Sequence, residues 1–274
     1  IHGPFKVSEQ KFWADREGLP EGTDRMRVTR QVFDAIKAHG EVMLSEDLIC
    51  AFFEKGGKFK APNTPVFEPL PDQTARVRQW LDTLPSGINV GVSWRSGQPG
   101  LIRDVSYTRI SEWGDILRTP NVNFILLQYS NKAEDIAREL EEAKSLFGVT
   151  IHVMPDLDLR DDFEGVVAMC RELDVVIAPG TTLRETSAAA GAQTWTLSTT
   201  PYLPDQWRID QSDGHADLIF PSMIHFTALR YGDRTGALAE VARRVRALVL
   251  EKLPEQNAAT IPSVATLAVD VALS

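Results

Sequence analysis

The stretch 173–197 constrains the fold of this chain more than any other. It opens with the short apolar run 175–178, which Pro179 and Gly180 end, a pattern typical of a buried parallel strand that leads into a turn. An Ala-rich helical segment follows and stops at Gly191, and a second apolar run occupies 194–197. The order strand, small-residue loop, helix, strand predicts one unit of a parallel α/β sheet.

The loop of this unit has a chemical use. Thr181 or Thr182 can cap the helix, and a helix N-terminus presents free N–H groups that suit a phosphate. Gly180 lets a ligand approach the backbone, and Glu185, in the first turn, can accept hydrogen bonds from both hydroxyls of a ribose. The alternative is that Gly180 only turns the chain and Glu185 only favours the helix dipole.

The same alternation continues on both sides of this unit. We predict strands at 88–94, 122–129 and 150–154, and helices at 74–84, 108–117, 131–147 and 161–173. A short apolar segment at 218–226 and a long helix at 234–253 follow. The predicted fold class is therefore α/β, a Rossmann-like parallel sheet with helices on both faces. In such sheets ligands bind at the carboxyl ends of the strands.

The two ends of the chain differ from this pattern. Residues 1–64 favour helices, at 29–38 and 45–54, without a convincing strand, and the prolines near 62–71 favour an extended linker. We predict a helical N-terminal region at 1–64, a Rossmann-like ligand-binding domain at 65–253, and a tail at 254–274 whose role the sequence leaves open.

Charge and cysteine content exclude several classes of protein. A net charge of −9 disfavours a general nucleic-acid-binding surface. Two cysteines are too few for a disulfide framework or a cysteine zinc site, and no apolar run is long enough to span a membrane. We therefore expect a cytoplasmic protein, and the first residue, Ile1, leaves open processing, truncation or a longer chain.

Polar residues follow the predicted strands where a ligand would lie. Arg95, Ser96 and Gly97 follow the first strand, and the Arg95 guanidinium suits a diphosphate or a sugar acid. Arg103 can add a second positive charge, and Gln128 ends the next strand. The alternative for both arginines is a solvated surface loop.

Other motifs are weaker. Asp156-Leu157-Asp158 is a D-x-D sequence that suits magnesium or manganese, but carboxylates before a helix more commonly cap it, and we predict no metal site. Five scattered histidines show no ligand spacing. The chain also lacks a Walker A motif, a G-x-S-x-G elbow and a G-x-G-x-x-G fingerprint, which disfavours a dehydrogenase.

A set of sequence segments, in order, resembles one enzyme family. They are V-S-W-R-S-G at 92–97, R-I-S-E-W-G-D-I-L at 109–117, N-F-I-L-L-Q-Y at 123–129, D-D-F-E-G-V-V-A-M-C-R-E-L-D-V-V-I at 161–177, and G-A-Q-T-W at 191–195. Over roughly 65–250 the chain resembles the C-terminal half of GT-B glycosyltransferases related to the heptosyltransferases. It is most similar to the bacterial transferases that follow tetratricopeptide repeats, a group linked with flagellin glycosylation.

The resemblance implies a nucleotide-sugar donor as substrate, an acceptor side in an N-terminal domain, and no metal or other cofactor. It places the donor phosphates near Arg95, Thr181 and Thr182, and the ribose or sugar near Glu185. The heptosyltransferase pattern has an Asp and a His where this chain has Gly180 and Glu185, so a heptose donor is not implied.

The expected function is an inverting, metal-independent sugar transfer to a protein or glycan hydroxyl. The alternatives are a reduced GT-B-like scaffold subunit without catalysis, favoured by the short region before the sheet, and a nucleotide-sugar epimerase or hydrolase. No motif in the sequence specifies the donor's base and sugar, the acceptor, the general base or the oligomeric state.

Overall fold

The computed structural model describes residues 64–97, 107–198, 208–209, 215–228 and 234–253. The chain divides into two compact units, Ile1–Lys60 and Ala61–Ser274, and every described residue belongs to the second. The helices predicted at 29–38 and 45–54, and the tail after 253, lie outside the described residues.

Six strands form one parallel sheet in the order β3-β2-β1-β4-β5-β6. The strands are β1 (Ile88–Val92), β2 (Val122–Leu126), β3 (Ile151–His152), β4 (Val175–Pro179), β5 (Thr194–Ser198) and β6 (Met223–Thr227). This is the strand order of a Rossmann-like fold, in which the order reverses between β1 and β4. The predicted fold class is confirmed.

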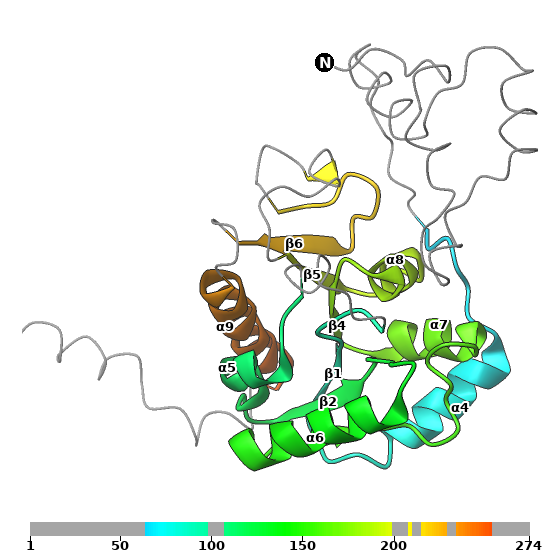
Figure 1. Cartoon of the computed structure of the whole chain (residues 1–274). Coiled ribbons are helices and arrows are strands. Elements are labelled where there is room, and N and C mark those ends of the chain that lie inside the picture. The colour runs from blue at the N-terminus through cyan, green and yellow to red at the C-terminus, as the bar shows by residue number, and fades with distance from the viewer. Residues whose placement is uncertain (1–63, 98–106, 199–207, 210–214, 229–233, 254–274) are drawn as a thin grey trace, which may run out of the picture. The chain divides into compact units, whose positions relative to one another are not determined.

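Helices cover both faces of the sheet (Figure 1). They are α4 (Pro71–Leu81), η4 (Ile110–Glu112), α5 (Gly114–Leu117), α6 (Ala133–Phe147), α7 (Phe163–Glu172), α8 (Thr182–Ala189) and α9 (Thr235–Lys252). One apolar cluster joins the sheet to α5, α6 and α9, and the other joins it to α4 and α7.

Alternation along each strand divides these two clusters. Val175 and Ile177 of β4 belong to the first cluster, whereas Val176 and Ala178 belong to the second. Because successive side chains of a strand point to opposite faces, a strand covered on both sides is apolar throughout. This is why the short continuous apolar run at 175–178 predicted β4 correctly.

The predicted elements differ from the observed ones mainly at their ends. The helix predicted at 108–117 is wrong: η4 and α5 replace it, and the chain bends at Trp113, which is fully buried and donates its indole N–H to Thr108 Oγ1 at 2.8 Å. Helix α4 begins at Pro71 rather than at Thr74, because proline is tolerated in the first helical turn.

The N-terminal end of the described domain is fixed to α8. The amides of Val66 and Phe67 both donate to the carbonyl of Ala189, at 2.7 and 2.9 Å. Gly191 follows with φ of +74°, and a side chain there would lie 2.7 Å from the ring of Pro65. Only glycine combines this left-handed backbone with so close an approach, which explains why α8 ends here.

Candidate functional site

A cleft of about 520 Å³ lies at the carboxyl ends of β1, β2 and β4. Because β1 pairs with β2 on one side and with β4 on the other, the cleft lies at the point where the strand order reverses. Parallel α/β sheets bind ligands at this position. The lining contains all the predicted site residues that the structure describes: Arg95, Ser96, Gly97, Gln128, Gly180, Thr181, Thr182 and Glu185.

The N-terminus of α8 forms one wall of the cleft. Thr181 is its N-cap residue, in extended conformation, and Thr182 begins the helix. Within the described residues no acceptor takes the amides of Thr182 or Leu183. Free amides at the positive end of a helix dipole suit an anion. Of the two predicted caps, Thr181 or Thr182, Thr181 occupies the N-cap position, but the predicted side-chain capping is wrong, because the Thr181 hydroxyl makes no capping hydrogen bond.

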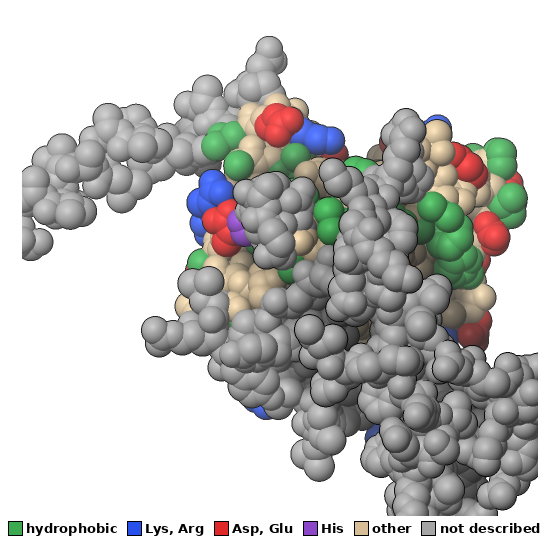
Figure 2. Space-filling model, turned by 90° about the horizontal axis from the view of Figure 1, so that it is seen from above, with side chains coloured by type: hydrophobic (Ala, Val, Ile, Leu, Met, Phe, Trp, Pro, Cys, Tyr) green, Lys and Arg blue, Asp and Glu red, His purple; other side chains and the backbone are tan. Residues whose placement is uncertain are grey.

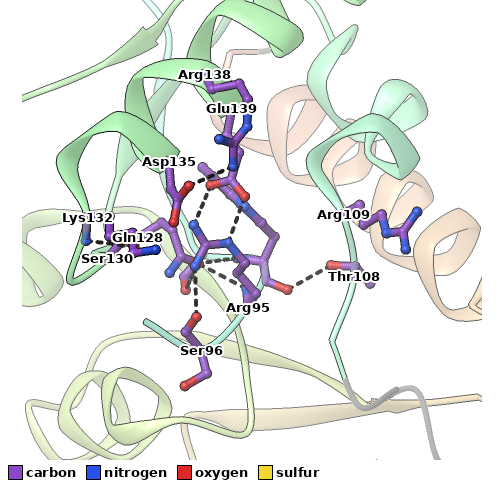
Figure 3. Close-up of polar contacts among 12 residues, drawn as sticks. Arg95, Ser96, Thr108, Arg109, Gln128, Ser130, Lys132, Asp135, Arg138 and Glu139 are labelled. Atoms are coloured by element: carbon purple, nitrogen blue, oxygen red, sulfur yellow. Dashed lines mark hydrogen bonds and ion pairs between the residues drawn. The ribbon is translucent and has the colours of Figure 1, made fainter. Parts of the chain in front are cut away.

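Arg95 lies on the opposite wall, and its charge is already paired. Its Nε and Nη2 donate to the two carboxylate oxygens of Glu139, on α6, at 2.7 and 2.8 Å, and its Nη1 donates to the carbonyl of Ser96 at 2.9 Å (Figure 3). Both side chains of the pair keep about 15% of their surface exposed. A ligand phosphate would therefore compete with Glu139 for this guanidinium.

Two loop residues after β1 and β2 pack closely. A Cβ at Gly97 would lie 2.3 Å from the ring of Tyr129, so a larger residue here would require that ring to shift. Tyr129 also lines the cleft. Gly180, across the cleft, differs: a Cβ there would be 3.4 Å from its nearest neighbour, Arg184 Nη1.

Gln128 organises the loop instead of presenting its amide to the cleft. It is fully buried, and its Oε1 accepts from Ser93 Oγ and from the amides of Trp94 and Arg95, at 3.0–3.1 Å. Its Nε2 donates to the carbonyl of Tyr129 at 2.7 Å. Protein groups thus engage both ends of the amide and support the loop, and the predicted ligand contact of Gln128 stays a prediction.

Glu185 lies in the first turn of α8, as predicted, and two arginines hold one of its oxygens. Arg184 donates to Oε1 through Nε at 2.9 Å and through Nη2, and Arg208 donates to Oε1 through Nη1 at 2.8 Å. Within the described residues Oε2 accepts no hydrogen bond. The side chain is 39% exposed, so Oε2 can accept from a ligand in the cleft.

The acidic run before α7 builds a turn and a helix cap. Asp158 Oδ1 accepts from the amides of Arg160 and Asp161 at 2.8 and 3.0 Å, which lowers the pKa of Asp158. Asp162 caps α7 by accepting from the amide of Gly165 at 2.9 Å. The capping interpretation of this run is confirmed, and the described part of the chain contains no group of three metal-ligating side chains.

The remaining candidates are either undescribed or structural. Arg103, His2 and His39 lie outside the described residues. His225 is buried and contacts Asp217, with 2.8 Å between Nε2 and Oδ2, as expected for a structural histidine. Burial lowers the pKa of His152, which lies on β3 and does not line the cleft.

The arginines around Glu185 were not among the predicted site residues. Arg184 follows the capping residues directly, and a positive side chain beside Glu185 was visible in the sequence. Arg208 and Asp217 come from the segment after β5, where no periodicity marks them. Only the packing of β6 beside β5 brings them to α8.

A second cleft of about 460 Å³ adjoins the first, with Arg95 and Tyr107 in the walls of both. Both arginines and carboxylates line it. Figure 3 shows Arg138 beside Asp135 on α6, and Arg109 on a separate segment, pointing away from Arg95. Arg138 donates to Asp135 at 2.8 Å, which lowers the pKa of that carboxyl group.

The visible surface mixes charges of both signs. In Figure 2 acidic and basic side chains stand next to one another on the described part of this face, with hydrophobic side chains between them. No helix within the described residues has the length and apolar character needed to cross a membrane.

No family model matches the sequence. The chain is 28% identical over 225 residues to protein FlbA of Caulobacter vibrioides, a match that covers 78% of this chain. It covers 33% of FlbA, so the chain spans about a third of the length of this curated relative.

The fold is similar to that of several solved glycosyltransferases. For the family 9 glycosyl transferase of Veillonella parvula the identity is 10%, the TM-score 0.45, and the coverage 68% of this chain and 53% of that one. The E. coli heptosyltransferase WaaC with ADP-2-deoxy-2-fluoro heptose is 16% identical, with a TM-score of 0.39, and the match covers 62% of this chain and 47% of that one. Anabaena HepE in complex with UDP-glucose is 14% identical, with a TM-score of 0.39, and the match covers 74% of this chain and 56% of that one.

Each of these three matches covers only part of both chains. The chain spans about half the length of each. At 10–16% identity the likeness is one of fold, and every TM-score lies below 0.5, so function is inferred from the site residues alone.

Proposed function

We propose that this chain binds a nucleotide-sugar donor in the cleft between β1 and β4 and transfers the sugar, with inversion, to a hydroxyl of a protein or glycan. The observation that carries the proposal is the composition of one cleft. The free amides of α8 and Arg95 suit a diphosphate, and Glu185, one helical turn away, suits a ribose.

The phosphate contacts supply the catalytic effect in this proposal. As the bond between sugar and phosphate breaks, negative charge develops on the leaving phosphate. The amides of Thr182 and Leu183 are already oriented toward such a charge, and Arg95 reaches it by exchanging Glu139 for the phosphate. Oriented donors stabilise a developing charge without a cost in reorganisation, except at Arg95, which must first leave Glu139.

Glu185 orients the donor. Its Oε2 accepts hydrogen bonds from the ribose hydroxyls while Arg184 and Arg208 hold Oε1. A charged hydrogen bond of this kind contributes about 1.5–3 kcal/mol. This would fix the nucleoside relative to the phosphates and leave the sugar to extend out of the cleft.

We expect the donor to bind without a divalent metal. The positive charge that magnesium would supply to a diphosphate is provided by Arg95 and by the α8 dipole. We also expect the acceptor hydroxyl and its general base to come from other segments, because the charged side chains of this cleft are already committed to the donor.

A scaffold subunit without catalysis is the second candidate. It is favoured by the pairing of both key charges, Arg95 with Glu139 and Glu185 with two arginines, which leaves neither dependent on a ligand. An epimerase or hydrolase on the same fold would share the donor site but would release product without an acceptor.

A thermal-shift screen separates these candidates. The full chain would be heated with UDP, GDP, ADP, CMP and their sugars, with and without magnesium. A donor at a hundredfold excess over its Kd should raise the Tm by about 5–10 °C. A shift with one nucleotide, equal with and without metal, supports the proposal, whereas no shift with any of them supports the scaffold.

Matched variants localise the site. Arg95→Ala and Glu185→Gln should abolish most of the shift. Arg243→Ala and Glu240→Gln are the controls, because these two residues form an ion pair on α9 and neither lines the cleft. If the four variants keep the same ligand-induced shift, the site assignment is wrong. Released sugar in the absence of an acceptor would instead indicate a hydrolase.

A further inference from the structure

A buried arginine links the cleft to the far edge of the sheet. Arg208 donates through Nη1 to Glu185 Oε1 at 2.8 Å and through Nε to Asp217 Oδ2 at 3.0 Å. Its side chain is only 7% exposed, and it does not line the cleft itself. A single guanidinium thus holds two carboxylates, one on α8 and one just before β6.

Asp217 is a fixed anchor for this arginine. Its side chain is fully buried, and its Oδ1 accepts from the amides of Ile219 and Phe220 at 2.9 and 2.8 Å. Its Oδ2 contacts His225 Nε2 at 2.8 Å as well as Arg208. Burial opposes ionisation, but these hydrogen bonds and the charge of Arg208 outweigh it and hold the pKa of Asp217 below its ordinary value.

Stability alone does not account for this arrangement. Burying an ion pair costs solvation that the attraction repays only in part. The third nitrogen of Arg208, Nη2, is buried and has no hydrogen-bond partner within the described residues, which adds a further cost. An unsatisfied buried group of this kind calls for an explanation other than stability.

The two arginines that contact Glu185 belong to different parts of the chain. Arg184 is the preceding residue on α8, so it moves with Glu185 when the helix moves. Arg208 belongs to a different segment, and through Asp217 it is tied to the residues that lead into β6. Arg208 therefore ties Glu185 to a segment outside α8, and this contact can set the direction of Oε2.

We infer that Arg208, anchored by Asp217, is a positioning residue that sets Glu185 for recognition of the donor's ribose. This inference rests on the proposed function, in which Glu185 Oε2 accepts from the ribose hydroxyls. It adds that recognition of a ribonucleotide over its deoxy analogue depends on a side chain that never touches the ligand.

Calorimetric titration with UDP, ADP and GDP, each paired with its 2′,3′-dideoxy analogue, tests this. For the nucleotide that the wild type binds, loss of both hydroxyls should weaken binding by about tenfold or more, the effect of a charged hydrogen bond. Arg208→Lys keeps the charge but cannot span both carboxylates. We expect its Kd ratio for the two nucleotides to fall to about one, with the dideoxy Kd unchanged within about twofold.

Arg171→Lys is the matched control. Arg171 donates to the carbonyl of Ala190 at 2.9 Å, so it also contacts the end of α8, but it does not touch Glu185. The control should keep the wild-type ratio. A merely structural loss at Arg208 would weaken both nucleotides equally, and an unchanged ratio in folded Arg208→Lys would overturn the inference.

Two further outcomes are decisive. If Arg208→Lys loses its cooperative thermal transition, His225→Leu is tested in its place, because this substitution removes one of the hydrogen bonds to Asp217. The Kd ratio of the two nucleotides should then fall in His225→Leu, and an unchanged ratio overturns the inference. If the wild type itself shows no ribose preference, the role of Glu185 fails and this inference fails with it. A wild-type preference that Arg208→Lys retains overturns only the role of Arg208.

Discussion

The two walls of the cleft hold their functional charges in different ways. On the β1 side, Arg95 is paired with Glu139, whose carboxylate has no other partner within the described residues and remains partly exposed. On the β4 side, Glu185 is held by two arginines, one of which continues into the buried carboxylate of Asp217.

This difference separates a charge that can be released from one that is fixed. A ligand phosphate can replace Glu139, because solvent already reaches that pair and only the two hydrogen bonds from Arg95 are exchanged. Glu185 cannot turn without breaking a network in which Asp217 makes four contacts. We therefore expect a mobile arginine on one wall and a rigid carboxylate on the other.

The largest effect should come from the anchor of the fixed wall. Asp217→Asn leaves the buried guanidinium of Arg208 without its main counter-charge, and we expect a loss of about 3–5 kcal/mol in the free energy of unfolding at pH 7. Urea unfolding measures it. Because the pKa of Asp217 is lowered on folding, its contribution is full above about pH 4 and is lost as the pH falls through the folded value.

The gap between the wild type and Asp217→Asn should therefore narrow in urea series taken at successively lower pH below about 4. A gap that stays constant would show that charge is not what Asp217 supplies. Glu139→Gln is the matched variant on the other wall, and it should cost far less stability, because its pair is partly exposed.

The next effect is on binding. Arg95→Ala removes the cation that we propose meets the donor phosphates, and the Kd for the nucleoside diphosphate should rise by about tenfold to a hundredfold. Calorimetry measures this Kd. Arg138→Ala is the control, because Arg138 is also paired with a carboxylate, Asp135 on α6, but does not line the first cleft. Equal losses in both variants would point to general charge rather than to a contact.

The glycines of the two walls should also differ. In Gly97→Ala the new methyl group meets the ring of Tyr129, at 2.3 Å in the present geometry, and should cost about 1–3 kcal/mol of stability. In Gly180→Ala the methyl group lies 3.4 Å from Arg184, and we expect a change within about 0.5 kcal/mol. Thermal unfolding of the two variants compares them, and similar losses would contradict the packing described for Gly97.

The smallest expected effect is a decrease in Kd instead of an increase, and it tests the difference between the two walls most directly. Glu139→Gln frees Arg95 from its ion pair, so the Kd for the nucleoside diphosphate should fall by a few-fold, less than about 1.4 kcal/mol. Removing the partner of Arg95 is thus expected to strengthen binding, whereas changing the partner of Glu185 weakens it. If Glu139→Gln weakens binding, the pair with Glu139 orients Arg95 for the ligand instead of competing with it.

The sequence by itself determined most elements of the sheet and which loops line the candidate cleft. Apolar runs such as 175–178 specify buried strands, and loops at strand ends collect Arg95, Gly97 and Thr182 at one cleft, because the carboxyl ends of parallel strands meet at one edge. Such patterns involve only residues close together in the chain, so they can be recognised from the sequence alone. The bend at Trp113 was missed because burial of its ring in the core, not helix propensity, decides the path there.

Only the tertiary structure decided which charges meet. Arg95 pairs with Glu139 across 44 positions in the chain, and Arg208 reaches Glu185 across 23. No spacing rule selects such partners, since the packing of α6 and β6 against the sheet brings them together. A side chain that looked available in the sequence, Arg95, is paired in the fold, and the residue that fixes Glu185, Arg208, gave no local signal.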